Sequence, residues 1–195
     1  MTPFKIYSPE TAHPPADDLL ASIRTTLGFV PNVVGATAES TPALQAFMEL
    51  NDRFAESSFD ATGRELIQIA ASVENQCGYC VAGHTAFAQM QSVPSEVIDA
   101  VRNNRPIDDH KLEALNRFTR AVMRERGMIR EQDLKRFLDA GYSRAQVLEV
   151  ILGVCVKTFS NLASNVIGIP LDDAFVGHAW SPETPHTRQR LRAVN

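Results

Sequence analysis

Apolar residues recur at spacings of three and four along most of this chain, and this period constrains the fold more than any other feature. Leu44, Phe47 and Met48 show the pattern, which continues as far as residue 167. Residues at these spacings lie on one face of an α-helix, whereas β-strands need an alternation that is weak here. The sequence therefore predicts an all-α protein.

Glycines and prolines divide the apolar pattern into separate helices. Gly127 and Gly141 are expected to end two of them, because glycine readily adopts the left-handed conformation that follows a helix. We expect helices over residues 17–27, 41–55, 61–74, 78–90, 94–102, 108–126, 131–140 and 144–159, followed by a shorter one over 161–167. Asn161 is the expected cap of that last helix. Residues 28–32 are an expected turn, and the segment after Pro170 is an expected loop.

The 195 residues are expected to form one domain, since this length is ordinary for a single core. Four prolines near the N-terminus predict an extended arm over residues 1–18. The all-helical domain is expected over residues 19–170, and a loop-like tail over residues 171–195. Three arginines of the tail are interpreted as a solvated basic end: Arg188, Arg190 and Arg192.

A faint internal repeat is a further hypothesis. An offset of 84 residues places Cys77 on Asn161 and Cys80 on Ser164. Both segments are predicted as a helix, a break and a second helix, as a duplicated unit would give. If the repeat is real, the second copy has lost both thiols, and the chemistry belongs to the first copy. A chance alignment of two apolar helices is the alternative.

Charge and hydropathy argue against several classes of partner. The chain has 19 Lys and Arg against 23 Asp and Glu, a net charge of −4, and no basic cluster of the kind that nucleic acids require. No apolar run reaches the roughly 18 residues of a membrane-spanning helix, and the N-terminus does not resemble a signal sequence. Three cysteines make no disulfide framework and fit a reducing compartment. We therefore expect a cytoplasmic protein that binds neither nucleic acid nor membrane.

Two cysteines and a histidine form the constellation that carries chemistry. Cys77 and Cys80 begin a predicted helix, where exposed backbone N–H groups and the helix dipole stabilise a thiolate. His84 follows Cys80 by four residues and Cys77 by seven, so all three lie on one helix face. An imidazole one turn from a thiol can accept its proton or pair with the thiolate. The pattern indicates a redox-active unit in which a disulfide can form.

Two other interpretations of the cysteine pair compete with redox chemistry. A CxxC pair is often half of a zinc site, but structural zinc needs four ligands. His84 could be the third, and the chain has no second CxxC to supply the fourth. A purely structural pair of buried thiols is the other alternative. We therefore expect neither a metal nor a cofactor.

Two glutamates compete for the role of proton relay beside the thiols. Glu74 is close to Cys77 in the sequence and is expected at an exposed helix end. Glu65 lies on an apolar helix, where a buried carboxylate suits proton transfer, and is preferred. Its alternative role is a surface pair with a residue one turn away. Cys155, in an apolar stretch, is expected to be a small buried hydrophobe and not a nucleophile.

The sequence resembles the alkylhydroperoxidase D-like (AhpD-like) branch of the carboxymuconolactone decarboxylase superfamily. The spacing that carries the resemblance is that of four residues: Glu65, Cys77, Cys80 and His84. Residues 28–32, 41–44 and 158–161 resemble its peroxidase-related subgroup, and the likeness covers residues 27–168. It implies an all-helical unit that assembles into trimers or hexamers, and thiol-dependent reduction of hydroperoxides.

The resemblance also implies a role for each site residue. The residue matching Cys80 attacks the peroxide, and the one matching Cys77 resolves the disulfide. Those matching His84 and Glu65 relay protons. The implied partners are a hydroperoxide and a dithiol reductant of lipoyl or thioredoxin type. The sequence departs from the family pattern at Tyr79, where peroxidase members carry histidine. This difference puts the rate and the reductant in question more than the reaction class.

Three functions stay open at this point. The preferred one is a peroxidase or disulfide reductase that cycles Cys77 and Cys80. The second is a redox sensor or adaptor, whose disulfide changes its partner. The third is a lactone decarboxylase, against which the CxxC pair argues, because those relatives typically lack it. A homo-oligomer, either a trimer or a hexamer, is expected as well, since a monomer with so many apolar helices would expose large apolar patches.

Overall fold

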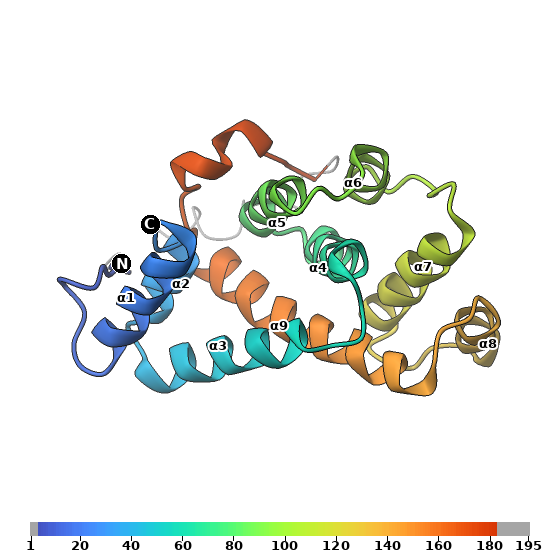
Figure 1. The fold of residues 1–195 in the computed structure, drawn as a ribbon, viewed down its shortest axis with the longest axis horizontal. Coiled ribbons are helices and arrows are strands. Elements are labelled where there is room, and N and C mark those ends of the chain that lie inside the picture. Colours follow the sequence, from blue (N-terminus) through green and yellow to red (C-terminus); the bar gives the residue numbers. More distant parts are fainter. Residues whose placement is uncertain (1–3, 183–195) are drawn as a thin grey trace, which may run out of the picture.

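The computed structural model describes residues 4–182, and within this range the protein is built of helices without strands (Figure 1). The elements in chain order are α1 (Ala16–Leu27), α2 (Asn32–Thr37), α3 (Thr41–Ala55), α4 (Ala61–Glu74), α5 (Gly78–Met90), α6 (Ser95–Arg102), α7 (His110–Arg124), α8 (Glu131–Asp139), α9 (Arg144–Ile167) and the 3-10 helix η1 (Asp173–His178). The all-α prediction is confirmed. The expected basic end at Arg188, Arg190 and Arg192 lies outside the described residues.

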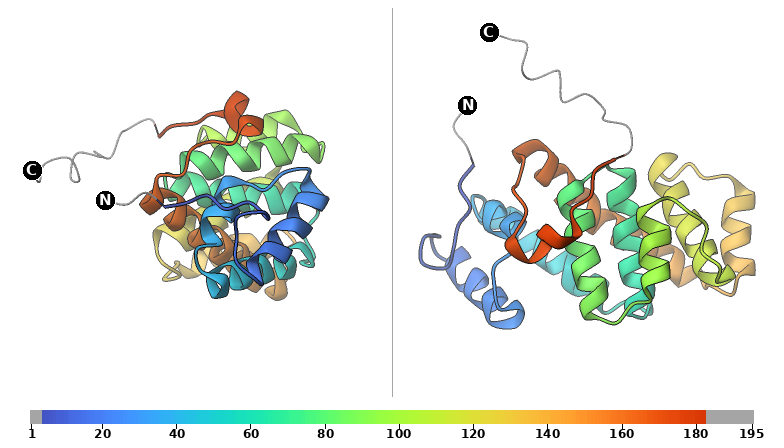
Figure 2. Two further views of the ribbon diagram at one scale, coloured as in Figure 1. Left: turned by 90° about the vertical axis from the view of Figure 1, so that its left-hand side faces the viewer. Right: turned by 90° about the horizontal axis from the view of Figure 1, so that it is seen from above.

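The fold is centred on α4, which packs against α5, α6, α7 and α9. The long helix α9 crosses the molecule with α3 alongside it (Figure 1). Seen from above, α1 and α2 lie at one end of the molecule, and α7 and α8 lie at the other (Figure 2). Because α5 also contacts α9 and η1, the cysteine pair that it carries is enclosed near the middle of the fold.

Local signals set several helix ends as predicted. Asp60 caps α4, since its carboxylate accepts a hydrogen bond from the Gly63 N–H at 2.8 Å. Gly127 and Gly141 follow α7 and α8 with φ angles of 82° and 91°. Only glycine adopts this left-handed conformation without strain, so both positions end their helices cleanly.

Close packing of α9 depends on one glycine. A Cβ atom at Gly153 would lie 2.6 Å from Phe54 Cζ on α3 and 2.8 Å from Ile67 Cγ2 on α4. Any larger residue would push α9 away from both helices. This close approach brings the polar side chains of α9 within reach of α4 and α5.

Several expectations about segments are wrong. The last two predicted helices are one helix, α9, so Asn161 lies inside it and caps nothing. The break expected in the second copy of the repeat is therefore absent, because the buried Asn161 amide is bonded to α4 instead. α1 begins at Ala16, inside the predicted arm, and the short α2 follows the predicted turn. The segment after Pro170 contains η1 and is not only loop.

The surface of α9 corrects two further expectations. By length and composition this helix could cross a membrane, whereas the sequence analysis expects no run long enough. One face of α9 packs against α3, α4, α5 and α7, as the face of a core helix does. The opposite face is open and carries Cys155, which is exposed and not buried. The helix α9 itself carries apolar residues on all of its sides, so the apolar pattern does not identify which face is buried.

Candidate functional site

The two cysteines lie at the N-terminus of α5, directly after the turn from α4. Cys77 is the N-cap of α5, and its Sγ accepts a hydrogen bond from the Cys80 N–H at 3.4 Å. Both residues are buried, with 0% and 3% of their surface exposed. The predicted spacing thus brings two thiols together where the helix dipole favours negative charge.

α9 supplies further contacts of the Cys80 sulfur. Ser164 Oγ lies 3.7 Å from Cys80 Sγ, and Ser160 Oγ lies 3.9 Å from it. Between these serines, the Asn161 amide donates to Ser72 Oγ on α4 at 3.2 Å. This bond holds α9 against α4 and keeps the two serine oxygens beside the thiol.

The surroundings make the two thiols chemically different. Burial opposes ionisation of Cys80, but the hydrogen bond from Cys77 and the positive charge of Lys157 lower its pKa well below the ordinary value. The pKa of Cys77 is raised, because its thiol is hydrogen-bonded to the Cys80 sulfur and because it is buried. These opposite directions favour Cys80 over Cys77 as the thiolate of the pair.

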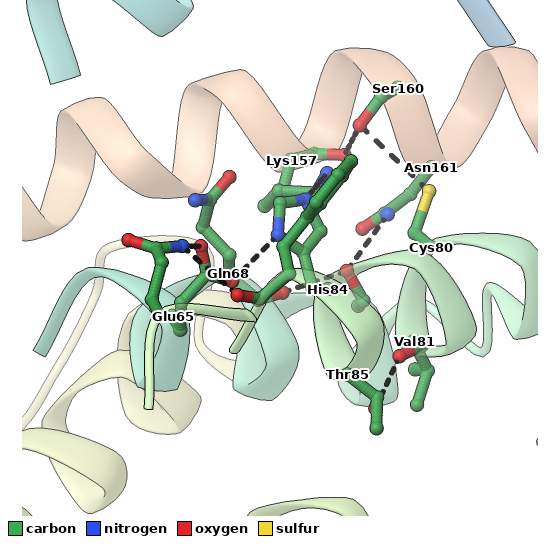
Figure 3. A network of polar contacts seen from close by, with 12 residues as sticks. Glu65, Gln68, Cys80, Val81, His84, Thr85, Lys157, Ser160 and Asn161 are labelled. Atoms are coloured by element: carbon green, nitrogen blue, oxygen red, sulfur yellow. Dashed lines mark hydrogen bonds and ion pairs between the residues drawn. The ribbon is translucent and has the colours of Figure 1, made fainter. Parts of the chain in front are cut away.

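A chain of polar contacts begins one turn further along α5 and joins three helices (Figure 3). His84 Nδ1 lies 2.9 Å from Glu65 Oε2 on α4, and His84 Nε2 lies 2.7 Å from Lys157 Nζ on α9. The second carboxylate oxygen of Glu65 accepts from Gln91 Nε2 at 2.7 Å. Glu65 and Lys157 are both buried, so the two charged groups of this chain are shielded from solvent, whereas Gln91 at its end is exposed.

A placement of protons with a charged lysine satisfies every contact in the chain. A lysine ammonium has only donors, so His84 Nε2 accepts from Lys157. Nδ1 then carries the ring hydrogen and donates it to Glu65, which accepts at both oxygens as a carboxylate does. The positive charge of Lys157 and the negative charge of Glu65 thus lie on opposite sides of a neutral imidazole.

The structure brings the predicted site residues together in two pairs. Cys77 contacts Cys80 at the start of α5. On the next turn of α5, His84 contacts Glu65 of α4. Within residues 4–182, no hydrogen bond joins the imidazole to either thiol, because both of its nitrogens are engaged by Glu65 and Lys157. Lys157 is not among the residues predicted from the sequence, although a single lysine in the apolar middle of a helix is a signal that could have identified it.

Glu74, the competing carboxylate, has a structural role instead. It accepts from Arg120 Nη1 at 2.6 Å and from Arg124 Nε at 2.8 Å, and its side chain is only 13% exposed. The expectation of an exposed helix end is wrong, because α7 packs over this part of α4. Glu65 is therefore the carboxylate of the site.

Tyr79, between the cysteines, anchors the surrounding chain. Its hydroxyl donates to Asp172 Oδ2 at 2.5 Å and accepts from the Val33 N–H at 3.2 Å. Asp172 also accepts from the Asn32 N–H at 3.0 Å. Burial, together with the bond to Asp172, raises the pKa of Tyr79, so the hydroxyl stays a neutral donor. Tyr79 thus ties the start of α2 and the chain after α9 to the cysteine turn.

A cavity of about 170 Å³ opens beside Cys80. Its wall is mainly apolar and includes the rings of Phe87 and Phe175, while Cys80, His84 and Lys157 contribute polar atoms. An apolar cavity of about 150 Å³ can hold benzene. The space beside Cys80 therefore fits a molecule of roughly that size.

Other parts of the described chain offer less for chemistry. A larger hollow of about 600 Å³ lies beside α6, α7 and Trp180, and none of its lining residues belongs to the thiol site. Between residues 4 and 182, no three His, Cys, Asp or Glu side chains gather closely enough to hold a metal ion. The zinc interpretation thus finds no ligand set in this part of the protein.

Fold and site together define a class of protein, in which helices enclose a vicinal thiol pair beside a buried glutamate and histidine. Residues 41–122, which include Glu65, both cysteines and His84, match the model of the Carboxymuconolactone decarboxylase family. Over this segment, which is less than half of the chain, the sequence is similar to that family. Among curated proteins, none matches the chain significantly.

Solved structures of AhpD-like proteins share the fold. An uncharacterized peroxidase-related protein from Ralstonia eutropha JMP134, with an alkylhydroperoxidase AhpD core, is similar with a TM-score of 0.79 at 23% identity, over 88% of this chain and 93% of that one. An uncharacterized peroxidase-related protein from Silicibacter sp. TM1040 gives 0.75 at 20% identity, over 91% and 98%. The debrominase Bmp8 in complex with 2,3,4-tribromopyrrole gives 0.71 at 16% identity, over 83% and 87%. At these identities the likeness concerns the fold, and the predicted AhpD-like architecture is confirmed.

Proposed function

We propose that the protein is a thiol-dependent peroxidase that reduces small organic hydroperoxides through Cys77 and Cys80. The observation that carries the proposal is an unlike pair of thiols beside an apolar cavity. Cys80 has the surroundings of a thiolate nucleophile, and Cys77 lies within reach as the resolving thiol. The family match and the fold of peroxidase-related proteins support the same class.

Each turnover consists of an oxidation and a reduction. The Cys80 thiolate attacks the terminal oxygen of the hydroperoxide, the O–O bond breaks, and the sulfur becomes a sulfenic acid while the alkoxide leaves and takes up a proton. The Cys77 thiol condenses with the sulfenic acid, which forms the disulfide and releases water. A dithiol of lipoyl or thioredoxin type then reduces the disulfide and is itself oxidised. The cytoplasm would supply such a reductant, so we propose that location as well.

Glu65 and His84 belong to the relay that moves protons during this cycle. His84 lies one turn along α5 from Cys80 and contacts Glu65 on α4, in the polar chain that ends at the cavity. A buried relay of this kind keeps a proton available without admitting water to the sulfenic acid.

The cavity favours a compact substrate. Its volume of about 170 Å³ is near that of cavities that hold a single small ring. The apolar wall favours an organic hydroperoxide over hydrogen peroxide, since apolar pockets bind by excluding water from apolar groups. The small volume favours a short alkyl or aryl group over a fatty-acid chain.

Two other functions would use the same pair of cysteines. The fold likeness to the debrominase Bmp8, together with the Phe87 and Phe175 rings in the cavity wall, favours reductive removal of halogen from a small aromatic ring as the second candidate. A redox sensor would form the same disulfide without turnover.

A turnover assay distinguishes these functions. The purified protein is supplied with a reduced lipoyl carrier or a thioredoxin system, and with tert-butyl, cumene and linoleic acid hydroperoxides and hydrogen peroxide in turn. A separate arm uses 2,3,4-tribromopyrrole, and Cys80→Ser is the matched control. We expect steady consumption of the compact organic hydroperoxides, and none by the control. Disulfide formation without turnover would favour the sensor, and bromide release without peroxide consumption would favour dehalogenation.

A further inference from the structure

Lys157 places a positive charge inside the protein, in the apolar middle of α9. The residue is 4% exposed, and among residues 4–182 it forms no ion pair with an aspartate or glutamate. Its Nζ donates to His84 Nε2, a neutral partner. Lysine is almost never buried without compensation, because moving a charge out of water is costly. The site must therefore supply a negative group close to the ammonium.

The face of α9 that carries Lys157 shows which group this is. Ser160 and Ser164 follow Lys157 by three and seven residues, so the three side chains lie on one side of the helix. Both serine hydroxyls contact Cys80 Sγ, and Figure 3 shows Lys157 and Ser160 on the side of α9 that faces α5. Lys157 and Cys80 also line the same small cavity. A thiolate at Cys80 would supply negative charge on the cavity side of this ammonium, as the Glu65 carboxylate does across the His84 ring.

We propose that Lys157 is the catalytic acid of this site. Its ammonium holds Cys80 as a thiolate, and it gives the leaving alkoxide its proton. Within the proposed relay, His84 and Glu65 hold Lys157 toward the cavity, and Lys157 is the member that meets the substrate. The acid role rests on the proposed peroxidase function, whereas the pairing of Lys157 with the thiolate is independent of it.

The other titratable groups around the cavity leave this role to Lys157. His84 uses Nδ1 for Glu65 and Nε2 for Lys157, so its ring reaches a substrate only through the lysine. Tyr79 directs its hydroxyl hydrogen to Asp172. The Lys157 ammonium, by contrast, has three donors and gives one of them to His84, so the lysine combines further exchangeable protons with a place in the cavity wall.

The protons balance over one cycle. When the thiolate attacks the hydroperoxide, the alkoxide takes a proton from the Lys157 ammonium and leaves as an alcohol, and a neutral amine remains. Cys77 and Cys80 then form the disulfide and release water. The dithiol that reduces this disulfide supplies two electrons and two protons. One proton stays on Cys77, and the other passes from Cys80 to the amine, which restores the pair of thiolate and ammonium.

Two substitutions separate the charge of Lys157 from its proton. Lys157→Gln removes the charge and keeps a donor for His84. Lys157→Arg keeps the charge but cannot release a proton, because guanidinium groups are not deprotonated in proteins. Lys135→Gln, at an exposed lysine of α8, is the matched control. All are made in a Cys155→Ser background, which removes the exposed thiol, and thermal unfolding checks the fold.

The first measurement is the ultraviolet absorbance of the thiolate as the pH is varied, without peroxide and with Cys80→Ser as the blank. We expect Lys157→Gln to raise the pKa of Cys80 by about 1–3. Lys157→Arg and Lys135→Gln should leave it low. An unchanged pKa in Lys157→Gln overturns the proposal, whatever the protein does with peroxide. Should Lys157→Gln fail to fold, Lys157→Met repeats this measurement without a polar side chain.

The second measurement is one round of Cys80 oxidation by tert-butyl hydroperoxide, at a pH where Cys80 is ionised in every variant. We expect Lys157→Arg to be slower than the unmodified protein by about 10²–10⁴-fold, the usual effect of losing a catalytic acid. An undiminished rate in Lys157→Arg overturns the acid role. If the unmodified protein is not oxidised at all, the proposed function fails instead, and the absorbance titration still decides the ion pair.

Discussion

Glu65 and Lys157 hold opposite nitrogens of one imidazole ring, at 2.9 Å from Nδ1 and 2.7 Å from Nε2 of His84. The carboxylate comes from α4 and the ammonium from α9, so the ring on α5 is fixed by both neighbouring helices. The two charges polarise the ring between them, because hydrogen bonds in such a chain strengthen one another. A change at Glu65 is therefore expected to act on Lys157, and through it on the thiolate, although the two charged groups do not touch.

Glu65→Gln removes the negative end of this chain and nearly preserves the shape of the side chain. We expect the variant to fold and to slow the oxidation of Cys80 by a hydroperoxide by about 10²–10⁴-fold, since this is the usual cost of losing a proton relay. The measurement is peroxide-dependent loss of the Cys80 thiol in a single turnover, followed by mass spectrometry.

Glu74→Gln is the matched control, and its expected effect is on stability. Glu74 pairs with the buried guanidinium of Arg120 and with Arg124. Removing one partner of a buried ion pair costs about 3–5 kcal/mol, and we expect the lower end here because Glu74 is partly open to solvent. Urea unfolding measures this loss, while the thiol rate should stay unchanged. Equal slowing of thiol oxidation by both substitutions would show that Glu65 has no special role.

The different surroundings of Cys77 and Cys80 predict different single-residue phenotypes. Cys77→Ser should react once with peroxide and then stop as a sulfenic or over-oxidised Cys80, because no thiol remains to form the disulfide. Cys80→Ser should not react appreciably, because the pKa of Cys77 is raised. Peroxide treatment followed by mass spectrometry with a sulfenic-acid trap identifies both products. Peroxide consumption at the full rate by Cys80→Ser would reverse the two roles.

The lowered pKa of Cys80 also predicts the pH dependence of its oxidation. A free cysteine loses thiolate as the pH falls below about 8.5, with a tenfold decrease for each further unit. Because the folded protein holds Cys80 as a thiolate well below that pH, its oxidation rate should stay level down to the lowered pKa and decline only beneath it. Stopped-flow oxidation of the protein and of free cysteine across this range makes the comparison. Parallel pH profiles for the two would contradict the assigned thiolate.

The sequence predicts well those features that neighbouring residues specify. The expected helices over residues 41–55, 61–74 and 78–90 coincide with α3, α4 and α5, because their caps and apolar periods are local. The four-residue spacing likewise places Cys80 and His84 on one side of α5. Half of the candidate site could therefore be derived without any knowledge of the fold.

The remaining half depends on contacts between distant segments. Lys157 is 73 residues from His84 along the chain, and only the packing of α9 against α5 brings them together. Because α9 carries apolar residues on all of its sides, the sequence does not show that Lys157 lies on the buried face and Cys155 on the exposed one. Asn161 is of a residue type that often caps helices, but in the fold its side-chain amide donates a hydrogen bond to Ser72. Such choices are made by tertiary partners, which a local pattern does not contain.

Tyr79→Phe tests whether the residue between the cysteines is structural. The substitution removes the hydroxyl that bonds Asp172 and the Val33 N–H, and leaves both buried groups short of a partner. We expect the free energy of unfolding to fall by about 1–3 kcal/mol. The rate of Cys80 oxidation should change little, because the hydroxyl is directed at Asp172 and not at the thiols. Denaturant unfolding tests the expected loss of stability, and single-turnover oxidation tests the expected rate. A large loss of rate with unchanged stability would assign Tyr79 to the chemistry.

The exposed face of α9 predicts where copies of this chain associate. Leu148, Ile151, Leu162 and Val166 lie along one side of the helix and are between 40% and 80% exposed. Their spacings of three, four and eleven residues form one stripe, with Cys155 between them. Contiguous apolar surface of this kind is typical of an interface, and contact with a second copy would remove it from water. We expect light scattering to show a homo-oligomer, either a trimer or a hexamer.

Charges on this stripe should separate the copies. Leu162→Glu combined with Val166→Glu is expected to convert the oligomer into the 21.5 kDa monomer, because association would bury unpaired carboxylates. Met128→Glu, at a residue that is 81% exposed and lies outside α9, between α7 and α8, is the matched control and should leave the oligomer intact. Circular dichroism confirms that both variants fold. A stable monomer of the unmodified chain at micromolar concentration contradicts the prediction, and an oligomer that survives both charges on α9 places the contact on another face.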